Sequence, residues 1–391
     1  MDAAAIKNFN TKPLFKTLVI AIYFLSLLII ALFAYRRPLY NWDMLAYMAL
    51  VVQEDHSDTN QIREITYKAA QDNIPAVDYE HLVGVTNRKD LSENSEAFFN
   101  KLPFYAVKPM YIKMVSLFYK AGFSLPMATV LPSIIFYLAI GLLFFYWLLK
   151  YLKLIWAFSA SLSIMFSGFM VFMARLSTPD CLSAFLLLSA FYFIIERPSL
   201  KWTFFFLILS EFARLDNILP CVFILSFLFF SRKWQRKINL AWYLLMLVIL
   251  VSCYFGITIV TMKPFGWNVL YYPTFARYLD LSHTFHFSFS FKAYLALVVS
   301  HAITAVVVYN FMFFMFFLVL ILYSPSFKYK NLTLEQSFCI MLVLTSLFRF
   351  VLYPDLSDRF NVAIYLCLLL VLVKRYAGLI TGFKPLSAGA D

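Results

Sequence analysis

Charged residues are scarce in this sequence. Only 14% of the 391 residues are Asp, Glu, Lys or Arg, whereas 62% are hydrophobic, including 45 Phe and 25 Tyr. A soluble protein of this length has too little polar surface to cover so much apolar side-chain area. The composition therefore excludes an ordinary soluble enzyme and predicts a polytopic membrane protein.

Cysteine and the common catalytic motifs are scarce as well. The five cysteines all lie in apolar runs without metal-ligand spacing, so we interpret them as small core hydrophobic residues. The sequence has no Gly-rich phosphate loop, no His-Glu-x-x-His and no nucleophile elbow, which argues against nucleotide hydrolysis and metalloprotease chemistry. His283 and His286 have a spacing that a metal site can use, but their Phe and Ser neighbours favour a membrane-skimming loop over about 262–290.

Apolar runs predict an all-α, polytopic transmembrane protein of about ten spans. The first run is long enough to cross the bilayer and no small-residue cleavage site follows it, so we expect a retained anchor rather than a cleaved signal. We expect residues 1–391 to form a single transmembrane domain. The apolar runs cover approximately residues 14–35, 127–149, 154–173, 180–195, 201–213, 217–231, 238–261, 291–323, 334–352 and 360–374.

The basic residues of the short loops predict the orientation. When the N-terminus is placed in the cytoplasm, clusters such as 232–237 fall on the cytoplasmic side, as the positive-inside rule requires, and the C-terminus is cytoplasmic too. We interpret the net charge of +12 as loops beside anionic lipid and expect no nucleic-acid partner.

The longest polar stretch, residues 36–107, then becomes the first periplasmic loop. Its residue patterns predict two or three short interfacial helices rather than strands. Residues 104–123 are apolar enough to suggest a further span, but a span there would invert every later loop. We therefore expect this segment to lie in the outer interface, where Lys108, Lys113 and Lys120 extend their charged ends toward water.

Asp43 follows the first span and lies between Trp42 and Met44. A carboxylate is costly to place where a membrane helix meets water. One interpretation is that Asp43 caps an interfacial helix beginning near Met44. The other is that Asp43 is a catalytic carboxylate. The local sequence favours neither over the other.

Other ionisable residues lie at separate helix ends on the same, outer side of the membrane as Asp43. Ionisable groups in such positions usually line a cavity. Asp180, directly after Pro179, is either a helix N-terminal charge or a second cavity carboxylate. Arg214 and Asp216 either pair with each other or bind phosphate and sugar, because a guanidinium group suits phosphate. The full set is Asp43, Asp180, Asp216, Asp355, Asp358, Arg175, Arg214, Arg349 and Arg359.

Arg349 lies inside an apolar run, between Phe348 and Phe350. An unpaired guanidinium group is costly in that position. We therefore expect a bound anion, or a carboxylate such as Asp358, as its partner.

The order and sidedness of these motifs resemble GT-C-type integral membrane glycosyltransferases, which use polyprenyl-phosphate sugars. The resemblance covers the whole transmembrane plan, including the long first outer loop with its interfacial helices. The motifs that carry it are short: Tyr40-Asn41-Trp42-Asp43, Ser177-Thr178-Pro179-Asp180, Arg214-Leu215-Asp216-Asn217 and the late Asp358-Arg359-Phe360, similar to a family Asp-Arg-Tyr turn.

The resemblance implies a mechanism and a set of roles. Asp43 is the expected general base on the acceptor hydroxyl, Asp180 is the second catalytic carboxylate, and the sugar is transferred with inversion. The first-loop motif has a single acid rather than adjacent acids, which argues against a metal-dependent oligosaccharyltransferase. The expected substrate-binding residues are Arg175, Arg214, Asp216, Arg349, Asp358, Arg359 and Lys108.

The resemblance also implies partners and a location. The donor is a polyprenyl-phosphate-linked sugar, and the acceptor is a lipid-linked or surface glycan. The expected location is the bacterial inner membrane, with the active site facing the periplasm. We predict no metal site and no definite cofactor, although bare carboxylates permit Mg²⁺ or Mn²⁺. The alternative is a transporter or flippase of a polyprenyl-linked saccharide, for which ionisable groups at mid-membrane and inverted repeats are typical.

Overall fold

The computed structural model of the chain describes residues 13–84, 86–231, 238–261, 290–307, 333–352 and 358–381. Over these ranges the regular structure is helical and no strand is formed, apart from one isolated bridge between Leu39 and Leu176. The all-α prediction is therefore confirmed for the part of the chain that the structure describes.

Five helical stretches in the described residues are long and apolar enough to cross a membrane. A sixth is present if α11 (Leu154–Met165) and α12 (Gly168–Arg175), bent by 60° at a short break, count as one span. All of them coincide with predicted apolar runs, which supports a membrane protein. The five are α2 (Pro13–Arg36), α10 (Leu125–Leu148), α16 (Leu240–Thr261), α20 (Leu334–Leu352) and Asp358–Ala377, which joins η3 (Asp358–Asn361) to α21 (Val362–Thr381).

Three further apolar helices, α13 (Asp180–Ile195), α14 (Leu200–Ala213) and α15 (Ile218–Phe230), are shorter than the roughly 20 residues that a span needs. α13 is nonetheless buried along almost its whole length, because it packs against α10, α14 and α21. The predicted run 291–323 contains α18 (Phe291–Val307), and its remainder lies outside the described residues. Length and composition thus support five or six of the ten predicted spans.

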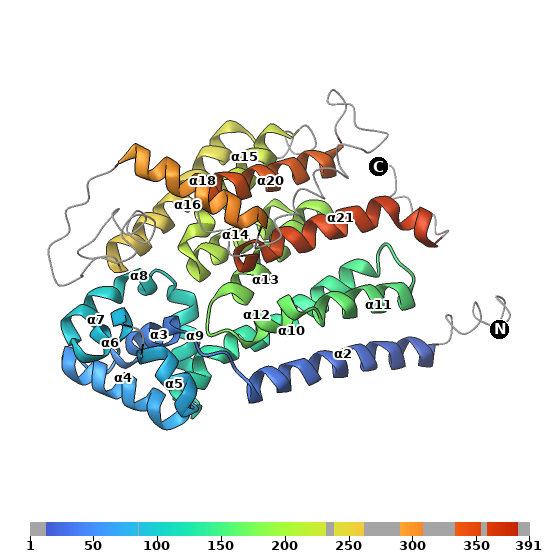
Figure 1. Ribbon diagram of the computed structural model, residues 1–391. Helices are drawn as coiled ribbons and strands as arrows, with labels where there is room; N and C mark the ends of the chain where they lie inside the picture. Colours follow the sequence, from blue (N-terminus) through green and yellow to red (C-terminus); the bar gives the residue numbers. More distant parts are fainter. Residues whose placement is uncertain are drawn as a thin grey trace.

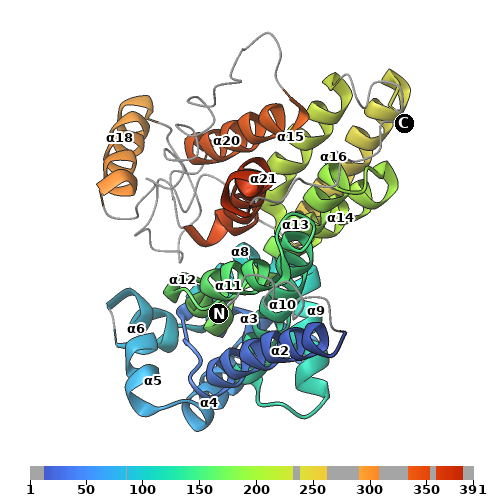
Figure 2. The same ribbon diagram turned by 90° about the vertical axis from the view of Figure 1, so that its right-hand side faces the viewer.

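The helices are arranged as a bundle with a lobe at one end. In Figure 1 the axes of four helices lie roughly parallel to one another: α2, α10, α11 and α21. In Figure 2 the axis of α21 is seen nearly end-on. The start of α2 and the end of α21 lie toward one end of the bundle, and the short helices gather at the other (Figure 1). These are α3 (Trp42–Val52), α4 (Thr59–Asn73), α5 (Ala76–Val83), α6 (Thr86–Glu93), α7 (Ser95–Lys101), α8 (Pro103–Ala106) and α9 (Pro109–Lys120).

The lobe is built around α3. Two of its helices begin with an asparagine cap: Asn41 accepts a hydrogen bond from the Met44 N–H, and Asn94 does the same for α7 from the Ala97 N–H. Nine of the eleven α3 residues are buried, packed among the side chains of α4, α7 and α9. The described part of 36–107 therefore contains more helices than the two or three predicted, and the first of them is a core element rather than a surface one.

α9 has one buried and one exposed face, as predicted for residues 104–123. Tyr111 and Val115 are buried, whereas the Lys113 and Lys120 side chains are 71% and 57% exposed and form ion pairs with Glu54. The expectation for Lys108 was wrong. Its ammonium group turns inward and donates to the hydroxyl of Tyr47, a residue with no exposed surface.

The first span is fastened to its neighbours by a tyrosine. The Tyr23 hydroxyl of α2 donates to the Gly141 carbonyl of α10 at 2.8 Å and lies 2.7 Å from the Ser161 hydroxyl of α11. Gly141 allows this approach, because an added Cβ would lie 2.8 Å from a Leu27 methyl carbon. A polar group buried among apolar side chains is stabilised by such hydrogen bonds.

Candidate functional site

Asp43 lies in the first turn of α3, at the junction of the bundle and the lobe. It is not the cap of this helix, because Asn41 fills that role. Asp43 is partly buried, and its Oδ1 accepts a hydrogen bond of 3.2 Å from the Tyr105 hydroxyl on α8. A carboxylate at a helix N-terminus still benefits from the helix dipole. Within the described residues no hydrogen bond to its second oxygen, Oδ2, is formed.

Lys108 connects Asp43 to the interior of the bundle. Its Nζ lies 2.8 Å from the Tyr47 hydroxyl and about 5 Å from the centres of the Tyr47 and Tyr105 rings (5.1 and 5.0 Å). Burial and then the charge of Arg214 lower the pKa of Lys108 to about 8, while the charges of Asp43 and Asp180 act in the opposite direction. The ammonium group is therefore within electrostatic reach of both predicted catalytic carboxylates.

Arg214 joins two carboxylates in the connection between α14 and η1 (Leu215–Asn217). The chain leaves α14 in an extended conformation at Arg214, and the side chain reaches back to α13. Arg214 Nη1 is bonded to Asp180 Oδ1, while its Nε and Nη2 bind the two oxygens of Asp216 at 3.0 and 3.1 Å. Arg214 therefore pairs with Asp216, one of the two alternatives that the sequence left open.

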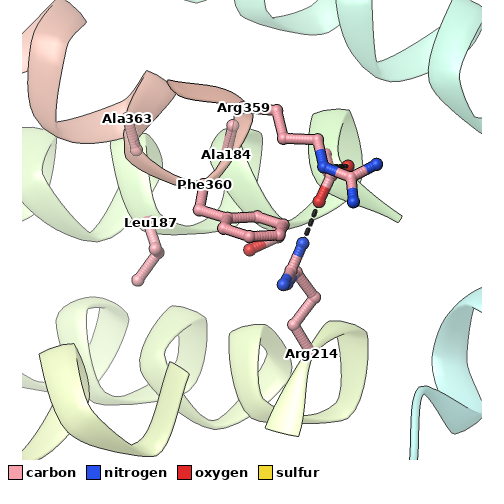
Figure 3. A pocket seen from close by; sticks show the side chains of 8 residues that line it. Ala184, Leu187, Arg214, Arg359, Phe360 and Ala363 are labelled. Atoms are coloured by element: carbon pink, nitrogen blue, oxygen red, sulfur yellow. Dashed lines mark hydrogen bonds and ion pairs between the residues drawn. The ribbon is translucent and has the colours of Figure 1, made fainter. Parts of the chain in front are cut away.

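Phe360 is the centre of a group of three arginines. The guanidinium carbons of Arg214, Arg349 and Arg359 lie 4.1, 4.9 and 4.9 Å from the centre of its ring. Figure 3 shows Arg214 and Arg359 on either side of this ring. A cation over an aromatic face is attracted by the ring quadrupole, so the phenyl group helps three like charges to lie close together.

Positive charge exceeds negative charge in this arginine group. Arg349 of α20 pairs with Asp216 and donates to the Phe360 carbonyl at 3.2 Å. Arg359 is held only loosely: its Nε lies 3.7 Å from Asp180 Oδ2 and makes no hydrogen bond in the described part of the chain. Among the described residues these three guanidinium groups form ion pairs with two carboxylates, an excess of positive charge that can attract an anion.

The space between these side chains is small. A pocket with room for about one water molecule is lined by Asp180, Arg214, Arg359, Phe360 and neighbouring residues of α13 and α21 (Figure 3). A phosphate group therefore enters only if these side chains move apart.

Two predicted substrate-binding residues have their contacts elsewhere. Arg175 donates from Nε to the Arg37 carbonyl at 2.5 Å and lies over the Phe33 ring, so it fastens α12 to the end of α2. Asp358 accepts a hydrogen bond of 2.9 Å from the Tyr365 hydroxyl. For Arg349 the sequence predicted a bound anion or a carboxylate such as Asp358 as partner, and the carboxylate that pairs with it in the structure is Asp216.

Several residues of the site were not among the sequence predictions. Tyr105 and Tyr47 line the space around Asp43 and Lys108, and Thr178 donates to Asp180 Oδ2 at 2.7 Å. Thr178 and Phe360 lie inside motifs that carried the family resemblance, so their positions were marked although their roles were not. For Tyr105, only its closeness to Lys108 in the sequence gave a signal.

Within the described residues no group of three or more His, Cys, Asp and Glu side chains is placed to hold a metal ion. Asp355, His283 and His286 lie outside the described residues. Comparisons of the chain with protein families, with curated proteins and with solved structures give no match. Fold and site together define a helical protein with several apolar helices that can cross a membrane and a cationic, carboxylate-containing site at one end of its bundle.

Proposed function

We propose that the protein is an inverting membrane glycosyltransferase, with Asp43 as the general base and a polyprenyl-phosphate-linked sugar as the donor. The observation that supports this most is the convergence of Asp43, Lys108 and the arginine group. Lys108 lies within electrostatic reach of Asp43, Asp180, Arg214 and Arg359, which come from four separate parts of the chain. Glycosyl transfer from a lipid phosphate needs a base beside a phosphate-binding group.

The proposed step is a single displacement. The acceptor hydroxyl oxygen forms a bond to the anomeric carbon of the sugar while the bond from that carbon to the phosphate oxygen breaks. The hydroxyl proton passes to Asp43 Oδ2, and polyprenyl phosphate leaves with the electron pair of the broken bond. Attack from the face opposite the leaving group inverts the anomeric configuration. Asp43 is held for this role by the Tyr105 hydroxyl on its other oxygen.

The leaving phosphate gains negative charge in this step, and the arginine group is suited to stabilise it. Arg359 is the best placed of the three arginines, since its ion pair with Asp180 is long, at 3.7 Å, and its Nε makes no hydrogen bond in the described residues. Lys108 adds a second cation on the side of Asp43. Donors held in place before the reaction stabilise developing charge at low reorganisation cost. The step needs no metal ion, because these cations carry the charge.

The proposed membrane arrangement includes the short helices. If α13, α14, α15 and α18 also cross or enter the bilayer, the count approaches the ten spans of a GT-C-like fold. The lobe of α3 to α9 then lies on the periplasmic face of a bacterial inner membrane, and both termini lie in the cytoplasm. A lipid-linked or surface glycan reaches Asp43 from this periplasmic side.

A transporter or flippase of a polyprenyl-linked saccharide is the second candidate. One observation favours it: Glu211 is a fully buried carboxylate within the apolar helix α14. Ionisable groups inside membrane helices often mark transport pathways. The two candidates differ in whether the bond between sugar and phosphate is broken.

The deciding experiment uses purified protein in liposomes and polyprenyl-phosphate sugars labelled in the sugar. A glycosyltransferase releases polyprenyl phosphate and produces a glycosylated acceptor of inverted configuration. A transporter moves the intact donor to the opposite leaflet and releases no polyprenyl phosphate. Movement without cleavage across a panel of sugars and glycan acceptors overturns the proposed transfer.

A further inference from the structure

Glu211 is a buried carboxylate outside the site described above. It lies on α14, one helical turn before Arg214, and has no exposed surface. α14 packs against α13, α9, α15 and α16, so the carboxyl group is enclosed by other helices. A fully buried acidic side chain in an apolar helix is rare and usually has a specific role.

The donor beside the carboxyl group of Glu211 is the thiol of Cys221, which is neutral and weak. Neither of its two oxygens has a hydrogen-bond partner in the described part of the chain. The adjacent Ser210 hydroxyl donates to the Leu207 carbonyl at 2.7 Å, and the Cys221 thiol is directed to the same carbonyl at 3.4 Å. Arg214, the nearest cation along the helix, is bonded to Asp180 and Asp216.

The charged and titratable groups on the described helices that pack against α14 also provide no cation for Glu211. Two thiols lie within electrostatic reach of Glu211, those of Cys221 on α15 and Cys253 on α16. A thiol is neutral and can at most donate a weak hydrogen bond. Asp180 of α13 and Lys108, next to α9, belong to the group around Arg214. Among the described residues of these helices, no cation forms an ion pair with Glu211.

An ionised carboxylate in this position is costly, because burying a charge without a partner carries a large desolvation penalty. A metal ion needs several oxygen ligands, and the described residues contain no group of three or more potential metal ligands. A proton removes the charge with no further ligand. It is the occupant that this enclosed space accommodates best.

We infer that Glu211 is a proton-binding site inside the helical bundle, occupied at neutral pH, so that α14 carries a carboxylic acid rather than a carboxylate. The inference does not depend on the proposed sugar transfer. It assigns to the bundle a protonatable group separate from the bonded carboxylates Asp180 and Asp216. The ligand of this site is a proton, exchanged with water when the helices around α14 separate.

The test is infrared spectroscopy of the purified protein at pH 7, comparing the wild type with E211Q. A protonated carboxyl group has a carbonyl stretch well separated from the bands of a carboxylate. The expected difference spectrum contains one protonated-carboxyl band that is lost in E211Q and shifts when the protein is unfolded and refolded in D₂O. Loss of a carboxylate band instead shows that Glu211 is ionised and overturns the inference.

Thermal stability gives an independent check. Gln is neutral and similar in shape to protonated Glu, so E211Q is expected to unfold within a few degrees of the wild type. E211L removes the polar group altogether and is expected to be as stable as the wild type or more stable. It also serves as the infrared reference if E211Q does not fold. Failure of both variants to fold means that a charged Glu211 is required, which contradicts the proton-binding site.

Discussion

The guanidinium group of Arg214 lies 4.1 Å from the centre of the Phe360 ring. This contact joins the connection after α14 to the start of the last helix, two segments far apart in the sequence. Asp180, on a third helix, completes the arrangement through its ion pair with Arg214. Three helices are therefore fixed at one end of the bundle by one arginine, one aromatic ring and one carboxylate.

Arg214→Ala is expected to destabilise the protein strongly. Removing the guanidinium group leaves Asp180, whose side chain is 2% exposed, without its main cation, and breaking a buried pair typically costs about 3–5 kcal/mol. Arg214→Lys keeps the charge but loses the paired hydrogen bonds to Asp216, so its loss of stability is expected to be smaller. Thermal unfolding in detergent measures both variants.

The control for this prediction is Lys89→Ala. Lys89 is 65% exposed and pairs only with Glu93, also exposed, so its removal changes stability by no more than about 0.5 kcal/mol. An Arg214→Ala protein as stable as the Lys89→Ala protein would show that the contacts of Arg214 do not hold the helices together.

Phe360→Leu tests the aromatic centre of the arginine group. Leucine fills much of the same volume but has no ring face, so each of the three cation–π contacts is lost, at about 0.5–2 kcal/mol for each contact. Phe360→Tyr keeps the ring and is expected to resemble the wild type. Unfolding temperature and donor binding are measured for both. Equal behaviour of the leucine and tyrosine variants would mean that the ring serves only as apolar filling.

Tyr105→Phe removes one hydroxyl group, the donor to Asp43 Oδ1. The ring and its packing against Trp42 and Tyr47 remain, so stability is expected to change by less than about 1.5 kcal/mol. Under the proposed function kcat falls about tenfold with little change in KM, since the hydroxyl positions the base rather than the donor. Tyr119→Phe, on the 42% exposed Tyr119, is the matched control. A rise in KM alone would place Tyr105 in donor binding.

Lys108 gives a pH dependence of stability. Burial and the charge of Arg214 lower its pKa from 10.5 to about 8 in the folded protein, so between these values the unfolded chain binds more protons than the folded one. Stability attributable to Lys108 therefore rises with pH from about 8 to 10.5. Lys108→Met keeps the length and removes the charge, so this rise is expected to disappear. A variant with the wild-type slope would assign the effect to another group.

The sequence predicted where the long helices lie better than it predicted which side chains pair with one another. Run length and hydropathy located the long helices from α2 to α21, because a membrane-crossing helix must be long and continuously apolar. Hydropathy also marked α13 and α14, but their 16 and 14 residues do not reach span length. A helix of this length crosses a bilayer only where the membrane is locally thinned, a property that the sequence of the helix does not encode.

Which charged side chains pair inside the site depends on how helices distant in the sequence pack together, and the local sequence does not encode that packing. Arg214 and Asp216 are two residues apart, and their pairing was one of the expected alternatives. Arg349 pairs with Asp216, although Asp358 is nearer to it in the sequence. The reason is that α20 packs against α15, and η1, which contains Asp216, leads directly into α15. Likewise Asn41 rather than Asp43 caps α3, since the helix begins at Trp42, two residues earlier than expected.

Asp43→Asn most directly tests the central claim, that Asp43 is the base of a glycosyl transfer. The amide keeps the shape of the side chain and its hydrogen bond from Tyr105 but cannot accept the acceptor's proton. Purified wild type, Asp43→Asn and the exposed-loop control Asp55→Asn are compared for binding of a polyprenyl-phosphate sugar and for its transfer. We expect unchanged donor binding and stability in Asp43→Asn with transfer reduced about 10²–10⁴-fold, the range for general base catalysis, and an Asp55→Asn protein as active as the wild type. Transfer by Asp43→Asn at the wild-type rate would contradict the account.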